Sequence, residues 1–271
     1  MMTRRIIWQY WETRGSKPKF IDGLRELATK NSGAELVLVT PETLRSYLPQ
    51  LPEPILQIRE PAHKADMIRT MLVAAHGGMW LDSDAIVLRD LNWLFDLLAE
   101  YEFVGFNDAG KLRPGRPWVR INCFLSRPEG EVVSEWVRQQ HAKFPKTVYS
   151  WEEIGSALLH GICLNNRQNV KILPFENICP IRWDQVEKFT SRGTGIVPIV
   201  RKCSIVMLSN YTLVRKLPSL QDLTVEEIAE GDYLLSAIMR HAMRREPAER
   251  LPKRRWWRRI GNGGSNRPEV A

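Results

Sequence analysis

The chain has 271 residues, of which 44% are hydrophobic and 26% charged, and its formal net charge is +8 at pH 7. These values are typical of a soluble globular protein and exclude an intrinsically disordered or collagen-like chain. One α/β domain with a small appendage accounts for this length, because a chain of this size buries a sizeable core without disulfide staples. Apolar runs such as residues 71–75 are far shorter than the roughly 18 residues that a membrane span needs.

The cysteines and the first residues indicate where the protein resides. Cys123, Cys163, Cys179 and Cys203 form no C-x-x-C pair and lack the spacing of zinc ligands, so we expect reduced thiols. Residues 1–11 lack the apolar region and the small-residue cleavage site of a signal peptide. We therefore expect a cytoplasmic protein.

Positive charge is concentrated near the C-terminus. Residues 240–259 hold nine Lys or Arg and two Glu, a net charge of +7. Their core, KRRWWRR (residues 253–259), places two tryptophans among cations, which is typical of segments that bind an anionic membrane surface. A solvated terminus and a nucleic-acid contact are the alternatives. We favour docking on the inner face of the membrane, expect no nucleic-acid partner, and assign residues 1–238 to the folded domain and residues 239–271 to a basic helix and disordered tail.

The first part of the chain predicts alternating strands and helices. Residues 5–11 (RIIWQYW) and 35–39 (ELVLV) are apolar, β-branched and aromatic, and predict buried strands. Between them, residues 19–30 predict an amphipathic helix. A second helix is expected to start at Thr40, with Pro41 in its first turn, before further prolines break the pattern. This order of elements implies a parallel sheet.

The next segment carries the most informative pattern. Residues 62–76 have apolar side chains at helical spacing and are followed by two glycines, which predicts a helix and its end. Strands are expected at residues 79–81 and 85–88, separated by Asp-Ser-Asp (residues 82–84). Later strands are expected at residues 102–106, 122–126, 170–173 and 204–208, and later helices at residues 129–144, 151–160 and 225–245.

Acidic residues gather around the strand that ends before residue 82. Asp82 and Asp84, at i and i+2, can converge on a hard cation such as Mg²⁺ or Mn²⁺, which prefers oxygen ligands. Open α/β sheets bind ligands outside the carboxyl ends of their strands. An Asp-x-Asp also occurs in turns and helix caps. Asp66 and Arg69 share one face of the preceding helix, either as a structural ion pair or as part of a site.

These residues carry a resemblance to a known family. Residues 63–91 (HKADMIRTMLVAAHGGMWLDSDAIVLRDL) resemble the signature of glycosyltransferases with a DXD-containing sugar-binding region, and residues 6–12 (IIWQYWE) are similar to the start of capsular polysaccharide synthesis proteins. Weaker similarities to the same family follow in order at residues 120–128, 151–159 and 173–183. The resemblance covers residues 5–210 and leaves out the basic C-terminal segment.

The resemblance implies a GT-A fold, which is a Rossmann-like, mixed and mainly parallel sheet flanked by helices. Such enzymes transfer a sugar from a nucleotide diphosphate sugar, commonly a uridine diphosphate sugar. They use a divalent metal, Mn²⁺ or Mg²⁺, and retain the configuration of the sugar. The implied partner is a saccharide or lipid-linked acceptor in the assembly of surface polysaccharide or glycolipid.

The resemblance also implies roles for individual residues. Asp84 matches the direct metal ligand, and Asp82 matches a metal-site residue that contacts ribose, sugar or metal-bound water. Asp66 and Arg69 match the pair that holds the donor sugar. The other matched positions are Trp80 beside the site, Trp8 stacking on the nucleobase and Asn122 contacting the sugar.

The family completes its metal site from a C-terminal loop, for which residues 208–211 (LSNY) offer Asn210. The chemistry of sugar transfer suits the matched residues, because negative charge develops on the leaving diphosphate and positive charge on the sugar ring. A metal on Asp84 together with Arg69 can stabilise the first charge. Asp66 can position the sugar and help with the second. These three residues are therefore the expected catalytic residues.

Other interpretations stand beside these. Trp8 and Trp11 on a buried strand can be core residues, and His63 and His76 are expected to be surface or capping histidines. A phosphatase of the haloacid dehalogenase type also carries an Asp-x-Asp after an apolar strand, although it leaves Asp66 without a role. A membrane-associated adaptor that kept the fold and lost activity is a third alternative.

Overall fold

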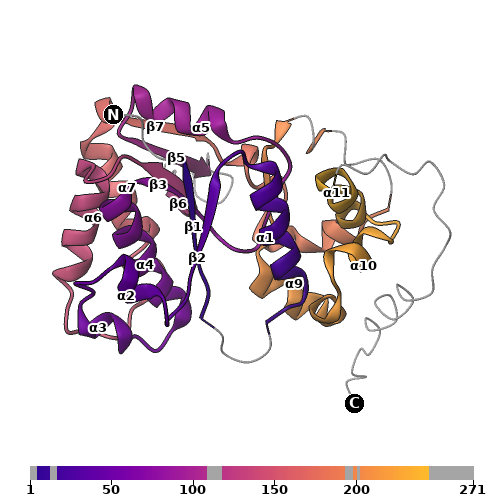
Figure 1. The fold of residues 1–271 in the computed structure, drawn as a ribbon, viewed down its shortest axis with the longest axis horizontal. Coiled ribbons are helices and arrows are strands. Elements are labelled where there is room, and N and C mark those ends of the chain that lie inside the picture. The colour runs from indigo at the N-terminus through magenta and orange to yellow at the C-terminus, as the bar shows by residue number, and fades with distance from the viewer. Residues whose placement is uncertain (1–4, 13–16, 109–117, 193–197, 200–201, 244–271) are drawn as a thin grey trace, which may run out of the picture. The chain divides into compact units, whose positions relative to one another are not determined.

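The computed structural model describes residues 5–12, 17–108, 118–192, 198–199 and 202–243 (Figure 1). The basic segment 253–259 and the predicted disordered tail from residue 261 lie outside the described residues.

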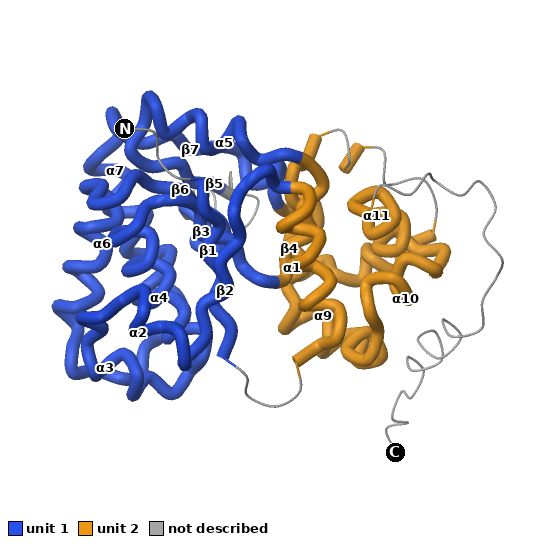
Figure 2. Tube along the Cα trace, in the orientation of Figure 1, with its two compact units in different colours: residues 1–14, 32–83, 90–178 blue, residues 15–31, 84–89, 179–271 orange. Residues whose placement is uncertain are grey.

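The chain forms two compact units (Figure 2). Unit 1 comprises residues 1–14, 32–83 and 90–178, and unit 2 comprises residues 15–31, 84–89 and 179–271. This division differs from the predicted split after residue 238, which falls inside helix α11 (Leu234–Ala242). The chain passes from unit 1 to unit 2 between Ser83 and Asp84, in the middle of the Asp-Ser-Asp step.

Unit 1 is built on a six-stranded sheet with the order β2-β1-β3-β6-β5-β7. Its strands are β1 (Ile6–Tyr10), β2 (Glu35–Val39), β3 (Gly78–Leu81), β5 (Phe103–Asp108), β6 (Trp118–Ser126) and β7 (Val170–Pro174). The pairs β1–β2, β1–β3 and β5–β7 are parallel, whereas β6 runs antiparallel to β3 and β5. The predicted fold class, a mixed and mainly parallel sheet flanked by helices, is therefore confirmed.

Helices cover this sheet. They are α2 (Leu44–Tyr47), α3 (Glu53–Leu56), α4 (Pro61–His76), α5 (Asn92–Asp96), α6 (Glu131–His141) and α7 (Ser156–Asn165), with short 3-10 turns at Leu97–Ala99, Arg167–Asn169 and Phe175–Asn177. Helix α4 packs on β1, β3 and β6, and α6 packs on α4. Pro61 lies at the start of α4, and Gly77 follows its last residue, as predicted. Gly77 has φ of +68°, and a Cβ at this position would meet Pro128, so glycine is the residue that fits here.

A group of aromatic rings lies in the core of unit 1. Phe103 and Phe124 stack with their ring centroids 5.8 Å apart, and Phe124 packs against Trp136 of α6 at 5.4 Å. Pairs of this kind add about 0.5–1.5 kcal/mol to the hydrophobic gain of burying the rings. The packing fixes α6 against the sheet, and α6 in turn positions residues of α4.

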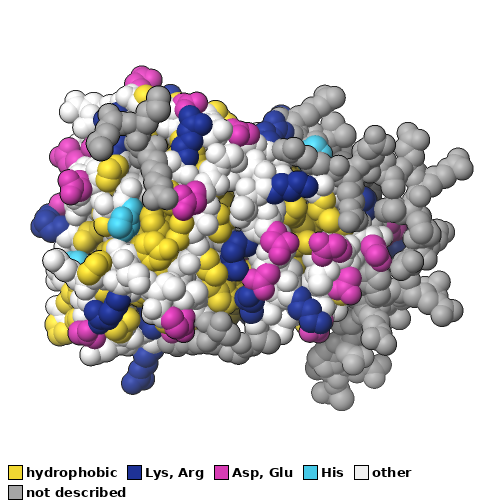
Figure 3. Space-filling view, viewed as in Figure 1, with side chains coloured by type: hydrophobic (Ala, Val, Ile, Leu, Met, Phe, Trp, Pro, Cys, Tyr) yellow, Lys and Arg dark blue, Asp and Glu magenta, His cyan; other side chains and the backbone are white. Residues whose placement is uncertain are grey.

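Unit 2 has a two-stranded antiparallel sheet of β4 (Ala85–Val87) and β8 (Ile205–Met207). Its helices are α1 (Phe20–Asn31), α9 (Asn210–Lys216), α10 (Val225–Ala229) and α11, with 3-10 segments at Trp183–Thr190 and Pro218–Asp222. Asn31 at the end of α1 donates its side-chain amide to the carbonyls of Val87 (2.9 Å) and Ala242 (2.8 Å). Figure 3 shows acidic side chains gathered over α1 and α10.

Three helix predictions need correction. The helix expected from Thr40 begins only at Leu44, after a turn, and the helix expected from residue 151 begins at Ser156. The helix expected over residues 225–245 is broken between α10 and α11. Tyr233 forms a β-bridge with Arg192 there, so tertiary pairing overrides the helical pattern.

All strands expected from the sequence are present, although β6 begins earlier than predicted, at Trp118. The cysteines of the described residues are free and buried, as expected. Among the helices that the structure describes, none combines the length and the apolar character of a membrane span.

Candidate functional site

The site in unit 1 starts from two residues of α4. Asp66 and Arg69 are three residues apart, so the helix places them on one face. Arg69 Nη2 lies 3.1 Å from Asp66 Oδ1, and the two side chains are only 7% and 12% exposed for Arg69 and Asp66, respectively. The expected ion pair between Asp66 and Arg69 is therefore present, and it is buried rather than solvated.

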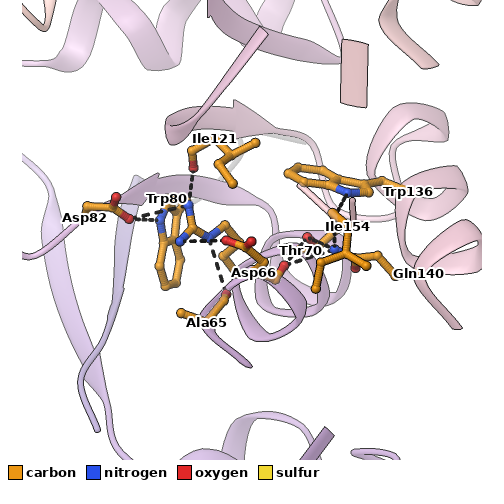
Figure 4. A network of polar contacts seen from close by, with 10 residues as sticks. Ala65, Asp66, Thr70, Trp80, Asp82, Ile121, Trp136, Gln140 and Ile154 are labelled. Carbon is orange, nitrogen blue, oxygen red and sulfur yellow. Dashed lines mark hydrogen bonds and ion pairs between the residues drawn. The ribbon is translucent and has the colours of Figure 1, made fainter. Parts of the chain in front are cut away.

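Arg69 makes polar contacts with several groups, and Figure 4 labels Ala65, Asp66, Asp82 and Ile121 among them. Its Nη1 donates to the carbonyl of Ile121 on β6 at 2.7 Å and lies 3.6 Å from Asp82 Oδ1. The guanidinium also lies over the ring of Trp80, 4.9 Å from its centroid, as in a cation–π contact. Trp80 donates its indole N–H to Asp82 Oδ1 at 2.7 Å. We call Asp66, Arg69, Trp80 and Asp82 the Arg69 network.

The Arg69 network holds two carboxyl groups and one cation. Burial raises the pKa of Asp66 to about 6, with Arg69 lowering it and Asp82 raising it further. Burial also raises the pKa of Asp82, against the lowering effects of Arg69 and of the hydrogen bond from Trp80. Ionising both carboxyls beside a single guanidinium is therefore unfavourable, and a bound cation or hydroxyl donor would relieve that cost.

Asn122 lies beside the Arg69 network on β6. Its carbonyl accepts the backbone N–H of Asp82 at 2.9 Å, next to the pairing of β3 with β6. Its side-chain Oδ1 is buried and has no hydrogen-bond partner among the described residues. A buried acceptor without a partner is rare in proteins, so this oxygen is available to a ligand hydroxyl.

In unit 2, Asp84 and Asn210 lie together. Asp84 Oδ2 accepts the backbone N–H of Asn210 at 2.6 Å, and the Asp84 carbonyl accepts that of Leu208 at 3.1 Å. Ser209 turns the chain with φ of +54° just before α9. The side-chain Oδ1 of Asn210 is buried and finds no partner in the described part of the chain. A carboxylate and an unpartnered amide oxygen are donors that Mg²⁺ and Mn²⁺ accept, so these residues fit the expected metal.

Across the described ranges, no cluster of three or more His, Cys, Asp and Glu side chains could hold a metal. The donors above are instead a carboxylate and an amide.

The model of the capsular polysaccharide synthesis protein family matches residues 1–149, which is more than half of the chain and includes the whole Arg69 network. The chain belongs to this family.

A curated relative of this family member is the O-glycosyltransferase PaGT of Phomopsis amygdali. The two are 33% identical over 78 residues, which make up 27% of this chain and 19% of PaGT. The match thus spans about a fifth of the length of PaGT.

Three similar solved structures are glycosyltransferases. PaToxG glycosyltransferase has a TM-score of 0.45 and 13% identity, with 60% of this chain and 70% of that chain covered. GlyE of Streptococcus pneumoniae TIGR4 has a TM-score of 0.41 and 15% identity, with 76% and 54% covered. Galactosyltransferase LgtC, in complex with donor and acceptor sugar analogs, has a TM-score of 0.42 and 14% identity, with 94% and 99% covered. Likeness at this level says nothing about the substrates of the present family member.

Trp8 of this family member lies in the core. It is 2% exposed, and its indole N–H donates to the carbonyl of Gly77 at 2.8 Å. Its ring packs against Tyr47, with centroids 5.4 Å apart, and His76, at 5.2 Å. This packing leaves no open face of Trp8 on which a nucleobase can stack, so the role that the resemblance implied for Trp8 does not fit the structure.

Several contacts of the site were not predicted from the sequence. The Ile121 carbonyl that binds Arg69 is a backbone atom and leaves no trace in the sequence. Gln140 of α6 donates to the carbonyl of Asp66 at 3.1 Å, and its position on the apolar face of α6, one turn after Trp136, is a signal that could have found it. His63, expected to be a surface or capping histidine, is buried with 7% exposure, because the rings of Tyr149 and Trp151 pack against it.

Proposed function

We propose that the chain is a glycosyltransferase of the GT-A type. It transfers a sugar from a nucleotide diphosphate sugar, a uridine diphosphate sugar, to a saccharide or lipid-linked acceptor during the assembly of surface polysaccharide. The observation that carries the proposal is the Arg69 network, in which one guanidinium lies near the buried carboxyl of Asp66 and the half-buried carboxyl of Asp82, within the segment that matches the family of capsular polysaccharide synthesis proteins. The name of the relative PaGT, an O-glycosyltransferase, supports the same class of reaction.

In this proposal the Arg69 network binds the donor sugar. The Asp66 carboxylate accepts hydrogen bonds from sugar hydroxyls, and the unpartnered Oδ1 of Asn122 accepts another. The carbonyls of Ala65 and Ile121 accept hydrogen bonds from the Arg69 guanidinium and fix its position. The indole N–H of Trp80 fixes the Asp82 carboxyl in the same way. A site whose groups are already oriented stabilises developing charge without reorganising during the reaction.

We assign the divalent cation, Mn²⁺ or Mg²⁺, to Asp84 and Asn210, with Asp82 two residues before Asp84. When bound, the cation supplies positive charge to the diphosphate leaving group. The hydrogen bond from the backbone N–H of Asn210 fixes the orientation of the Asp84 carboxylate. The Asn210 side chain offers a second oxygen, which is unpartnered within the described residues.

We further propose that the sugar keeps its configuration. An inverting transfer needs an enzyme base that takes the proton of the acceptor hydroxyl. Retention follows from the glycosyltransferase family that residues 63–91 resemble, whose members keep the configuration of the sugar. A transfer on the face of the leaving group needs no such base, because the leaving phosphate itself can accept the proton.

Calorimetric and thermal-shift titrations test the proposal. Wild type, Asp84→Ala and the control Asp232→Ala, which removes an exposed acid of unit 2, are titrated with nucleotide diphosphate sugars with and without Mn²⁺. Ligand binding to the native state raises the unfolding temperature. We expect a metal-dependent shift in wild type and in Asp232→Ala that is lost in Asp84→Ala. The absence of a shift with every donor would favour the phosphatase, tested by hydrolysis of a phosphate monoester, or the adaptor.

A further inference from the structure

Residues 149–155 form a loop that is fastened to α6 at Ile154, which lies beside Trp136 and Gln140 (Figure 4). The carbonyl of Ile154 accepts the indole N–H of Trp136 at 2.9 Å and the side-chain amide of Gln140 at 2.8 Å. The same amide reaches the carbonyl of Asp66 at 3.1 Å. One glutamine of α6 therefore fastens the loop to the turn of α4 that carries Asp66.

The loop approaches the Asp66 carboxyl closely. A Cβ at Gly155 would lie 3.3 Å from Asp66 Oδ2 and 2.7 Å from the side chain of Ile121. Glu152 of the same loop has φ of +90°, a backbone conformation that a non-glycine residue adopts only at a cost. Such strain is concentrated at ligand-binding segments, where the surrounding structure maintains it.

The outer part of the loop presents an aromatic surface. Trp151 is 72% exposed, although large indole rings are mostly buried in proteins. Its ring centroid lies 6.0 Å from that of His63, and His63 lies 6.0 Å from Tyr149. His63 is one helical turn before Asp66 on α4, so the aromatic surface and the Arg69 network lie on the same face of one helix.

His63 carries an unsatisfied polar atom. The residue is only 7% exposed, and its Nε2 has no hydrogen-bond partner among the described residues. Buried nitrogens are normally paired, so the position of His63 under Tyr149 and Trp151 is a costly one that the packing of the loop maintains.

We propose that Trp151 and His63 form the subsite for the acceptor saccharide, which rests on the proposed glycosyltransferase function. A pyranose has an apolar face of C–H bonds and a rim of hydroxyls. The apolar face stacks on the exposed indole of Trp151, and the buried His63 ring packs against that indole and supports it. Sites for small ligands are lined mainly by apolar and aromatic side chains of this kind. The loop then holds the acceptor next to Asp66, where the donor sugar is bound.

Nuclear magnetic resonance of the ¹⁵N-labelled full chain tests the subsite without any donor. The probes are the methyl glycosides of glucose, galactose, mannose and N-acetylglucosamine, and the disaccharides lactose and cellobiose. We expect a saccharide to shift the indole N–H resonance of Trp151 and to leave that of Trp93 unchanged. Trp93 is a suitable control because it lies on α5 of the same unit and is also exposed, at 41%. Trp151→Ala raises the Kd of this saccharide about tenfold, Trp151→Tyr raises it less, and Trp93→Ala leaves it unchanged.

The inference is overturned when no probe shifts the Trp151 resonance, or when Trp151→Ala binds the saccharide as wild type does. Folding of each variant is checked by its unfolding temperature. Donor binding is measured separately by calorimetry on wild type. A wild type that binds saccharide at Trp151 but no nucleotide sugar would retain a saccharide site while refuting the proposed transferase.

Discussion

Asp66 and Asp82 share one cation, because the guanidinium of Arg69 lies 3.1 Å from a carboxyl oxygen of the first and 3.6 Å from one of the second. A single guanidinium neutralises only one of these two acids. A second negative charge is unfavourable in the free protein. Desolvation by burial accordingly raises the pKa values of Asp66 and Asp82. A functional site can sustain such a cost when its ligand relieves it.

The first prediction concerns stability and pH. The pKa of Asp66 is raised to about 6 in the folded chain, above the value of 3.8 for an unperturbed carboxyl. The folded state therefore binds the proton more tightly, and the stability contributed by Asp66 falls as the pH rises from about 4 to about 6. Asp66→Asn removes this penalty, so we expect the variant to be as stable as wild type at pH 4 and about 1–3 kcal/mol more stable at pH 8.

Urea unfolding at several pH values measures this difference. Asp22→Asn is the control, because hydrogen bonding to Lys17 lowers the pKa of the exposed Asp22 and its ionised form is stabilising. That variant gains no stability as the pH rises. A difference for Asp66→Asn that stays constant between pH 4 and pH 8 would contradict the assigned pKa.

The second prediction concerns Arg69. Arg69→Met leaves the buried carboxyl of Asp66 and the half-buried carboxyl of Asp82 without a cation and frees the carbonyl of Ile121, so we expect the free energy of unfolding to fall by about 3–5 kcal/mol at pH 7. The loss shrinks toward pH 5, because protonated acids no longer repel each other. The double variant Arg69→Met with Asp66→Asn recovers part of the loss, since only one acid remains.

A double-mutant cycle measured by urea unfolding tests this coupling. Additive effects of the two substitutions would mean that Arg69 and Asp66 contribute independently, against the geometry of the pair. Arg138→Met serves as the control, because Arg138 pairs with Glu135 on the exposed face of α6 and such surface pairs contribute little.

The sequence predicts the contacts of this site between residues that are close along the chain, and it does not predict those between distant residues. Helical spacing places Asp66 beside Arg69, and the Asp-Ser-Asp step follows β3 as expected. The contacts from Ile121 and Gln140 come from β6 and α6, far along the chain, and a single sequence holds no record of such pairings.

The same reasoning explains the misplaced start of α7. Residues 151–155 have the composition of a helix, yet Glu153 accepts hydrogen bonds from the backbone and side chain of Ser150 and from Lys146. Gln140 and Trp136 then hold the carbonyl of Ile154. Contacts that compete with the helix in this way are set by tertiary structure, which local propensity does not contain.

The third prediction concerns the metal site. Asn210→Ala removes an amide oxygen that has no partner among the described residues, so we expect little change in the unfolding temperature without metal. The Mn²⁺ concentration needed for half-maximal donor binding rises about tenfold. Asn177→Ala is the control, an asparagine of unit 1 that lies outside both donor sets. Calorimetric titration of Mn²⁺ in the presence of a nucleotide sugar gives the comparison, and an unchanged Mn²⁺ requirement would remove Asn210 from the metal site.

The last prediction concerns the basic segment, residues 253–259, which carries KRRWWRR. Each cation near an anionic surface contributes about 1 kcal/mol to binding, and the two tryptophans favour the interface between water and hydrocarbon. We therefore expect the full chain to co-sediment with vesicles that contain phosphatidylglycerol and to be released by high salt. A chain that ends at residue 252 binds less, and a variant with Trp256 and Trp257 replaced by alanine keeps a weaker, fully salt-sensitive binding. If truncation left vesicle binding unchanged, the segment would be a solvated terminus and the described units would carry the attraction.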